Sequence, residues 1–400
     1  MQTIKLIYKI GRGPSSSHTM GPSKAAEIFK KKYPSANTYK VFLYGSLALT
    51  GKGHLTDVAI EEAFLPAKCE IIWEKDKELP YHPNAMKLEA INENNQSIGS
   101  EIVYSVGGGD IVWEKDIGNP QSPVNDIYSM NELVTIQNWA YNTGKSYWEY
   151  VEETEDNDLW DYLNEIWKEM KASIERGLEA EGVIPGGLAL HRKASSYIMK
   201  SNGYDSNLQN KALVFAYSLA VSEENACGGT IVTAPTCGAC GVLPSVLYHL
   251  QSRHNFSDKK MLRALATAGL VGNIVKDNAS ISGAEAGCQA EIGTACSMAA
   301  AAATQLFGGS PAQIEYSAEM GMEHHLGMTC DPVAGLVQIP CIERCAFAAQ
   351  RAMSCNLYAM LSDGKHRISF DTVIATMMEI GKNLPNIYKE TSLGGLARQY

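Results

Sequence analysis

The sequence lacks the features that mark membrane and nucleic-acid-binding proteins. No stretch of about 18 residues is both apolar and uncharged, because Gln289 and Glu291 interrupt the Ala-rich segment 286–307. No basic run is longer than Lys30–Lys32, and 34 Lys and Arg residues against 44 Asp and Glu give a formal net charge of −10. We therefore expect neither a membrane nor nucleic acid as a partner.

Other absences narrow the class further. The N-terminal segment MQTIKLIYKIGRGPSSS has neither the apolar core nor the cleavage site of a signal peptide, which predicts a cytoplasmic protein. The sequence shows no internal repeat and no low-complexity tract. Gly107–Gly109 lacks the GxGxxG spacing of a nucleotide-binding loop, and these glycines are better explained by a close approach of the backbone to a neighbouring segment.

The local patterns divide the chain into two domains. Before residue 120, strand and helix signals alternate: strands at Thr3–Tyr8, Thr38–Tyr44 and Cys69–Trp73, a helix at Ser23–Lys32, and a hairpin of Met86–Ile91 with Glu101–Val106. The polar stretch Gly118–Asn125 predicts a linker. Beyond it nearly all signals are helical: Tyr128–Glu153, Leu159–Glu181, Asn207–Glu224, Val242–Arg253, Lys259–Asn273, Cys288–Phe307, Ile314–His325, Cys341–Leu361 and Phe370–Lys382. We expect an α+β domain over residues 1–120 and a larger all-helical catalytic domain over residues 128–400.

Cysteine is the abundant residue of chemical interest. Nine of the ten cysteines lie between Cys227 and Cys355, and without a secretion signal metal or redox use is a better expectation than disulfides. Cys288 and Cys341 fall at predicted helix N-termini, where backbone amides stabilise an anionic centre, and Cys330 lies in the loop between them. Their spacing alone leaves two interpretations open, an iron–sulfur cluster on three thiolates or buried structural thiols.

The pair Cys237 and Cys240 forms a CxxC motif, which suggests zinc or a thioredoxin-like redox pair. A zinc site would need a second pair of ligands, and none has the expected spacing. A redox pair would need a βαβ context, whereas this region is predicted to be helical. Neither interpretation is favoured.

Several longer strings are more specific than any spacing. GPSSSHTMGP, LYGSLALTGKGHLTD, GGTIVTAPTCGACGVLP, NASISGAEAGCQAEIG and EHHLGMTCDPVAGLVQIPCIER occur in this order and resemble the bacterial iron–sulfur L-serine dehydratases. The resemblance implies an N-terminal β domain fused to a helical α domain, L-serine as substrate, and pyruvate and ammonia as products. It also implies a [4Fe–4S] cluster, whose three cysteine ligands map onto Cys288, Cys330 and Cys341. We also expect a homodimer, although the sequence itself does not give the oligomeric state.

The sequence departs from this family at two points. Some members end in a cysteine that folds back onto the open iron, whereas this chain ends in LARQY, so we expect no such capping. Position 345, often Asn in the family, is Cys345 here, one helical turn after Cys341. It is either a spare ligand or a packed thiol, and we expect packing.

Dehydration of serine needs a base for the Cα proton, and a histidine with a pKa near neutrality suits this role. The resemblance points to His18 and His54 as catalytic residues, with His54 the preferred base. For the substrate carboxylate, the run from Ser15 to Thr19 offers hydroxyls and amides, although the same run would also suit an ordinary helix cap. The residues expected to bind substrate are Ser16, Ser17, Thr19, Lys52, Asn278 and Ser280.

Three alternatives share this scaffold. An L-cysteine desulfidase would expel the thiol in place of the hydroxyl, and an L-threonine dehydratase would need room for one more methyl group. A non-catalytic iron–sulfur sensor would need no base, so the histidine-bearing loops of the first domain argue against it.

Overall fold

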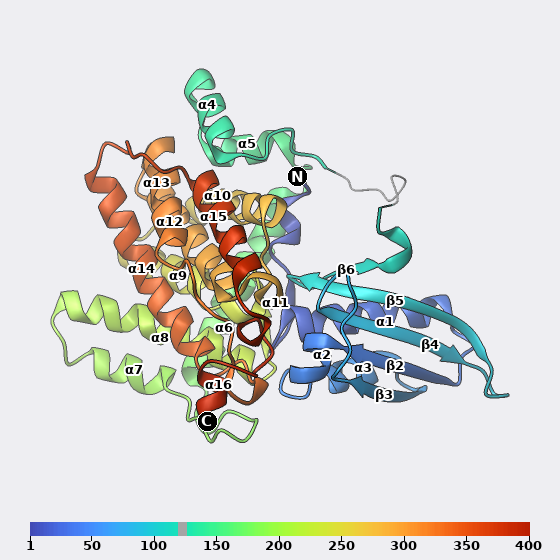
Figure 1. Cartoon of the computed structure of the whole chain (residues 1–400). Coiled ribbons are helices and arrows are strands. Elements are labelled where there is room, and N and C mark those ends of the chain that lie inside the picture. The colour runs from blue at the N-terminus through green and yellow to red at the C-terminus, as the bar shows by residue number, and fades with distance from the viewer. Residues whose placement is uncertain (119–125) are drawn as a thin grey trace.

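The computed structural model describes residues 1–118 and 126–400. It consists of a sheet domain and a helical body that lie side by side (Figure 1). Apart from Gly118, the predicted linker 118–125 lies outside the described residues. We retain 1–120 and 128–400 as proposed domain limits. Within the described ranges, no helix combines the length and the apolar character needed to cross a membrane.

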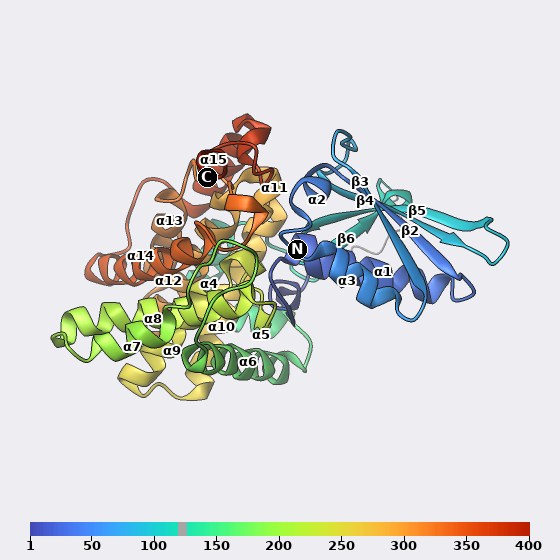
Figure 2. The same ribbon diagram turned by 90° about the horizontal axis from the view of Figure 1, so that it is seen from below.

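The sheet domain is built on five strands in the order β3-β2-β4-β5-β6. β2 and β3 are parallel, and the other neighbours are antiparallel. Helices α1 (Gly21–Lys32) and α3 (Thr56–Phe64) cover one face (Figure 2). Alternate residues of β2 are buried against them, as expected for a strand with one face in the core. The strands are β2 Thr38–Tyr44, β3 Lys68–Glu74, β4 Asn84–Ile91, β5 Ser97–Gly107 and β6 Asp110–Trp113.

Most predictions for this domain are confirmed, namely the strands at 38–44 and 69–73, the helix at 23–32 and the β4–β5 hairpin. The glycines 107–109 have positive φ angles of 102°, 57° and 77°, and a Cβ on Gly107 would lie 3.2 Å from the Cβ of Ser282. The prediction of a close backbone approach at this run is therefore also confirmed.

The predicted strand Thr3–Tyr8 is wrong. Ile4–Leu6 form a short 3₁₀ helix, and the strand comes later, as β1 (Ile10–Arg12), which pairs with β7 (Thr230–Val232) of the helical body. Ile4, Ile7 and Tyr8 are fully buried in the core of that body. Their i, i+3, i+4 spacing is helical, and it outweighed the β-branched composition of the segment.

The helical body surrounds α12 (Thr294–Leu306), nearly all of which is buried. Its alanines allow close approach of the neighbouring helices α9, α10, α13 and α14. The other long helices are α4 Leu133–Thr143, α5 Tyr147–Thr154, α6 Leu159–Glu179, α7 Ala194–Ser201, α8 Ser206–Ala226, α9 Val242–His254, α10 Asp258–Asn278, α13 Pro311–Glu323, α14 Cys341–Leu361 and α15 Phe370–Asn383.

Two predicted helices are interrupted. The segment 128–153 forms α4 and α5, because Gly144 ends α4 in the left-handed conformation with φ 71°. The segment that follows Cys288 begins with one π-helical turn, Gln289–Gly293, before α12 continues it. Helix α7 was not predicted. These local departures leave the overall architecture as expected, an α+β domain followed by a mostly helical one.

Candidate active site

The three candidate cysteine ligands converge on one small cavity between the two domains. Cys288 and Cys330 are buried, and Cys341 is half-buried. The sheet domain contributes His54, and Ser15 comes from the segment just before α1. The complete lining is Ser15, His54, Gly238, Cys288, Glu291, Ile292, Cys330, Pro332, Val337, Cys341 and Glu390.

Local structure explains how each thiol is positioned. Cys288 caps the π-helical turn that leads into α12, and Cys341 is the first residue of α14, so two thiols lie at helix N-termini as predicted. Cys330 is held by backbone pairing with the C-terminal segment, through a 2.8 Å hydrogen bond from its amide to the carbonyl of Tyr388. A hydrogen bond with Cys288 and burial raise the pKa of Cys330. Burial and the Cys288 thiol also raise that of Cys341. Converting these thiols together to thiolates requires a cationic partner such as a metal centre.

Gly283 shows how closely this cavity is packed. A Cβ at this position would lie 2.6 Å from Oε2 of Glu291 and 3.1 Å from Sγ of Cys330. Any larger residue here would require Glu291 to move and would press on the sulfur of Cys330.

His54 and His18 are in contact, with ring centroids 4.4 Å apart. The Nδ1 of His54 lies 3.0 Å from the carbonyl oxygen of Thr50, to which it donates its proton, so its Nε2 carries a free lone pair. Burial lowers the pKa of His54 to about 4. The expectation of a pKa near neutrality is therefore corrected, and the imidazole is neutral, in its basic form, at physiological pH.

His18 is completely buried and differs from His54 in having both nitrogens engaged. Its Nδ1 lies 2.9 Å from the hydroxyl of Ser17, and its Nε2 lies 3.1 Å from the hydroxyl of Ser46. Burial and the neighbouring His54 lower its pKa. With no nitrogen free, His18 is less suited than His54 to take a proton from a ligand.

Two carboxyl groups of the cavity were not identified from the sequence. Oε1 of Glu390 lies 3.5 Å from Nδ1 of His18 and 3.8 Å from Nε2 of His54. Burial raises the pKa of Glu390, and Glu291 and Cys288 raise it further. Glu291, whose Oε2 lies 3.9 Å from Sγ of Cys288, has its pKa raised to about 7 by burial. The only sequence signal for Glu291 was its place in the string NASISGAEAGCQAEIG, and Glu390 opens the segment ETSLGGLA near the end of the chain, to which the family resemblance also extends.

The predicted substrate residues divide into two groups. Ser16, Ser17 and Thr19 form a π-helical turn next to the histidines, and the Thr19 hydroxyl donates to the backbone carbonyl of His54 at 2.7 Å. The other three lie away from the histidines, and none of the six predicted substrate residues is in the lining of the cavity, to which only Ser15 of the run from Ser15 to Thr19 belongs. Lys52 is exposed with its ammonium 5.7 Å from the centre of the Trp73 ring, the Asn278 amide is bonded to Asn131, and the Ser280 hydroxyl accepts the Ser282 amide.

The remaining cysteines near the site are packed. Sγ of Cys345 lies 3.1 Å from the carbonyl oxygen of Gly238, and the residue is buried, in agreement with the expected packing role. Cys237 and Cys240 are buried in a separate apolar cluster, and neither lines the cavity.

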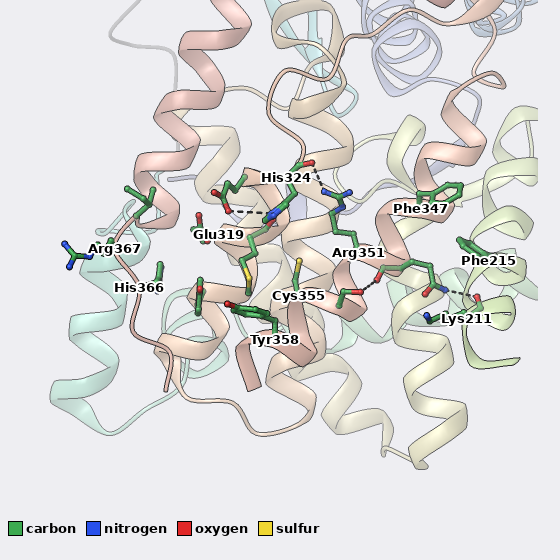
Figure 3. A pocket seen from close by; sticks show the side chains of 16 residues that line it. Lys211, Phe215, Glu319, His324, Phe347, Arg351, Cys355, Tyr358, His366 and Arg367 are labelled. Atoms are coloured by element: carbon green, nitrogen blue, oxygen red, sulfur yellow. Dashed lines mark hydrogen bonds and ion pairs between the residues drawn. The ribbon is translucent and has the colours of Figure 1, made fainter. Parts of the chain in front are cut away.

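A much larger pocket lies elsewhere. It has a volume of about 820 Å³ and lies between α13, α14 and the loop that contains His366 (Figure 3). Glu319, Arg351 and Tyr358 are among its lining residues, whereas none of the three candidate ligands is. Its size alone does not make it the catalytic site.

Comparisons with known proteins cover nearly the whole chain. Residues 74–397 match the family described as serine dehydratase alpha chain, and residues 3–65 match serine dehydratase beta chain. The chain is 39% identical to an L-serine dehydratase of Streptomyces coelicolor and 40% identical to L-serine dehydratase 1 of Escherichia coli, and each comparison covers 98% of this chain and 97% of the relative. It is 38% identical to an L-serine dehydratase of Haemophilus influenzae, with the same coverage.

Proposed function

The chain belongs to the serine dehydratase family, and we propose that it is an L-serine dehydratase, a lyase that converts L-serine to pyruvate and ammonia. We further propose a [4Fe–4S] cluster on Cys288, Cys330 and Cys341 as its cofactor. The observation that carries this proposal is the meeting of three thiols and a neutral histidine at one buried cavity.

The donor set fits such a cluster. Three thiols that are not in disulfides face one cavity, and two of them lie at helix N-termini that favour an anionic centre. No fourth cysteine lines the cavity in the part of the chain that the structure describes. A cluster held by three thiolates keeps one iron open to substrate. When bound here, it would supply a Lewis acid for the departing hydroxyl group.

A side chain of the protein then removes the Cα proton of the substrate. Nε2 of His54 faces the cavity with a free lone pair, because Nδ1 is committed to Thr50. We assign the removal of the Cα proton to this atom. The run from Ser15 to Thr19 lies beside it, with Ser15 in the cavity lining, and we propose that this run binds the substrate carboxylate. Loss of water leaves 2-aminoacrylate, which tautomerises and takes up water to give pyruvate and ammonia.

The proposal also includes the location, the oligomeric state and the ligand of the enzyme. We place the enzyme in the cytoplasm and expect a homodimer, with a small amino acid as ligand. The net charge of −10 gives no basis for nucleic-acid binding.

The test is anaerobic reconstitution with iron and sulfide, followed by an assay that couples pyruvate formation to a dehydrogenase. The expected result is about four irons per chain and pyruvate formation from L-serine. Protein that holds the cluster but forms no pyruvate would contradict the enzymatic assignment. Zinc in place of iron would contradict the cofactor.

A further inference from the structure

The carboxyl group of Glu390 has one oxygen that faces the two histidines and one that is buried without a partner. Oε1 faces the two histidines, 3.5 Å from Nδ1 of His18 and 3.8 Å from Nε2 of His54. Oε2 is buried and has no hydrogen-bond partner among the described residues. Burial of a polar atom without a partner is costly, so a group in this position is expected to meet a ligand.

Both domains fix Glu390 in place. Its backbone adopts the left-handed conformation, with φ 56°. Its amide donates to the carbonyl of Cys330 at 2.7 Å, and the Ser46 hydroxyl of the sheet domain donates to its carbonyl at 2.7 Å. A non-glycine residue held in this conformation by its surroundings is typical of functional sites.

The charges around this carboxyl favour a cationic ligand. The cavity also contains the carboxyl of Glu291, and none of its lining residues is a lysine or arginine. Arg344, which lies near the cysteines, donates instead to the Thr329 carbonyl and to Asp331. A buried acidic site of this kind is stabilised by a positively charged group with hydrogen atoms to donate.

The ammonium group of an α-amino acid is such a positively charged donor, and it lies next to the hydrogen that the base removes. The ammonium and the Cα hydrogen are carried by the same carbon, and the two acceptors Glu390 Oε1 and His54 Nε2 are 3.8 Å apart. We propose that Glu390 binds the α-ammonium group of the substrate and so restricts the site to 2-amino acids. This inference rests on the proposed function.

The experiment compares two ligands that differ in the ammonium group, L-serine and 3-hydroxypropionate, on reconstituted holoenzyme. In E390Q, KM for L-serine should rise about 10- to 100-fold, because a charge-assisted hydrogen bond is lost. The inhibition constant of 3-hydroxypropionate should change by less than about threefold, since it never makes this bond. The matched control is E343Q, which removes an exposed carboxylate paired with Lys193 and should alter neither constant. If E390Q does not turn over, protection from thermal unfolding by each ligand replaces the kinetic constants.

The outcomes separate the two proposals. An unchanged KM in E390Q, or an equal loss of affinity for both ligands, would overturn the role of Glu390. A selective loss of L-serine affinity in E291Q but not in E390Q would also overturn it. E390D keeps the negative charge, so it should recover part of the preference for L-serine over 3-hydroxypropionate. If E390Q fails to hold iron, E390D is measured in its place. Wild-type holoenzyme that makes no pyruvate from L-serine would instead defeat the proposed function.

Discussion

His54 donates its Nδ1 proton to the carbonyl oxygen of Thr50, four residues earlier, over 3.0 Å. This bond fixes the tautomer and directs the Nε2 lone pair into the cavity that the three cysteines share. Burial lowers the pKa of the ring to about 4, so the ring is in its neutral, proton-accepting form at neutral pH. This geometry supports the proposed role of His54 as the base, whereas both ring nitrogens of His18 contact serine hydroxyls.

The first prediction concerns this base. H54A should keep its iron, because His54 is not among the three thiol ligands, but kcat should fall about 10²–10⁴-fold, the usual contribution of a general base. The measurement is kcat by the pyruvate assay together with iron content. T19V, which removes only the hydroxyl that holds the His54 carbonyl, should lower kcat less. A normal kcat in H54A would reassign the base, with His18 next to be tested.

The second prediction separates ligand from packed thiol. C288A, C330A and C341A should each lose the cluster, whereas C345A should retain about four irons, because Cys345 is already bonded to the Gly238 carbonyl. Iron and sulfide analysis with the visible absorption spectrum distinguishes the two groups. Removal of iron from the wild type by a chelator should lower its thermal unfolding midpoint, since a cluster that binds only the folded state stabilises it. Loss of iron in C345A would make Cys345 a ligand.

The third prediction tests the packing around the cysteines. G283A places a Cβ 2.6 Å from Glu291 and 3.1 Å from the Cys330 sulfur. The residues around it must shift, at a cost of about 1–3 kcal/mol, and the variant should bind less iron and lose turnover. G203A is the control, because its nearest neighbour would be a backbone oxygen at 3.5 Å. Full iron content in G283A would show that the residues around position 283 can move to accept the added methyl group without disturbing the cysteines.

The sequence predicted helices and strands better than it predicted spatial neighbours. The strand predicted at Thr38–Tyr44 is β2, and Cys288, Cys330 and Cys341, which the family resemblance singled out, lie at one cavity. The contact of His18 with His54 depends on how two loops of the sheet domain fold together, which no local pattern encodes. Glu390 reaches the site only because its segment pairs with the backbone of Cys330, 60 residues earlier in the chain.

The last prediction concerns how the domains are joined. Asp110 of β6 binds the Lys9 ammonium at 2.5 Å through Oδ1 and the Lys276 ammonium at 2.5 Å through Oδ2. It thereby ties the sheet domain to both the N-terminal segment and α10. Burial acts to raise the pKa of Asp110, but the two lysines outweigh it and hold the pKa below its usual value.

D110N should therefore lower the free energy of unfolding by about 3 kcal/mol at pH 7, because it leaves two poorly solvated lysines without their counter-charge. The wild-type advantage is fully present above the unfolded-state pKa of about 3.9 and is lost as the pH falls through the lower folded-state pKa. Urea unfolding of both proteins at pH 7 and at pH 3 measures this difference. D158N, which removes an exposed carboxylate paired with Lys5, should have little effect at either pH. If D110N were as stable as the wild type at pH 7, the ion triad would not hold the two domains together.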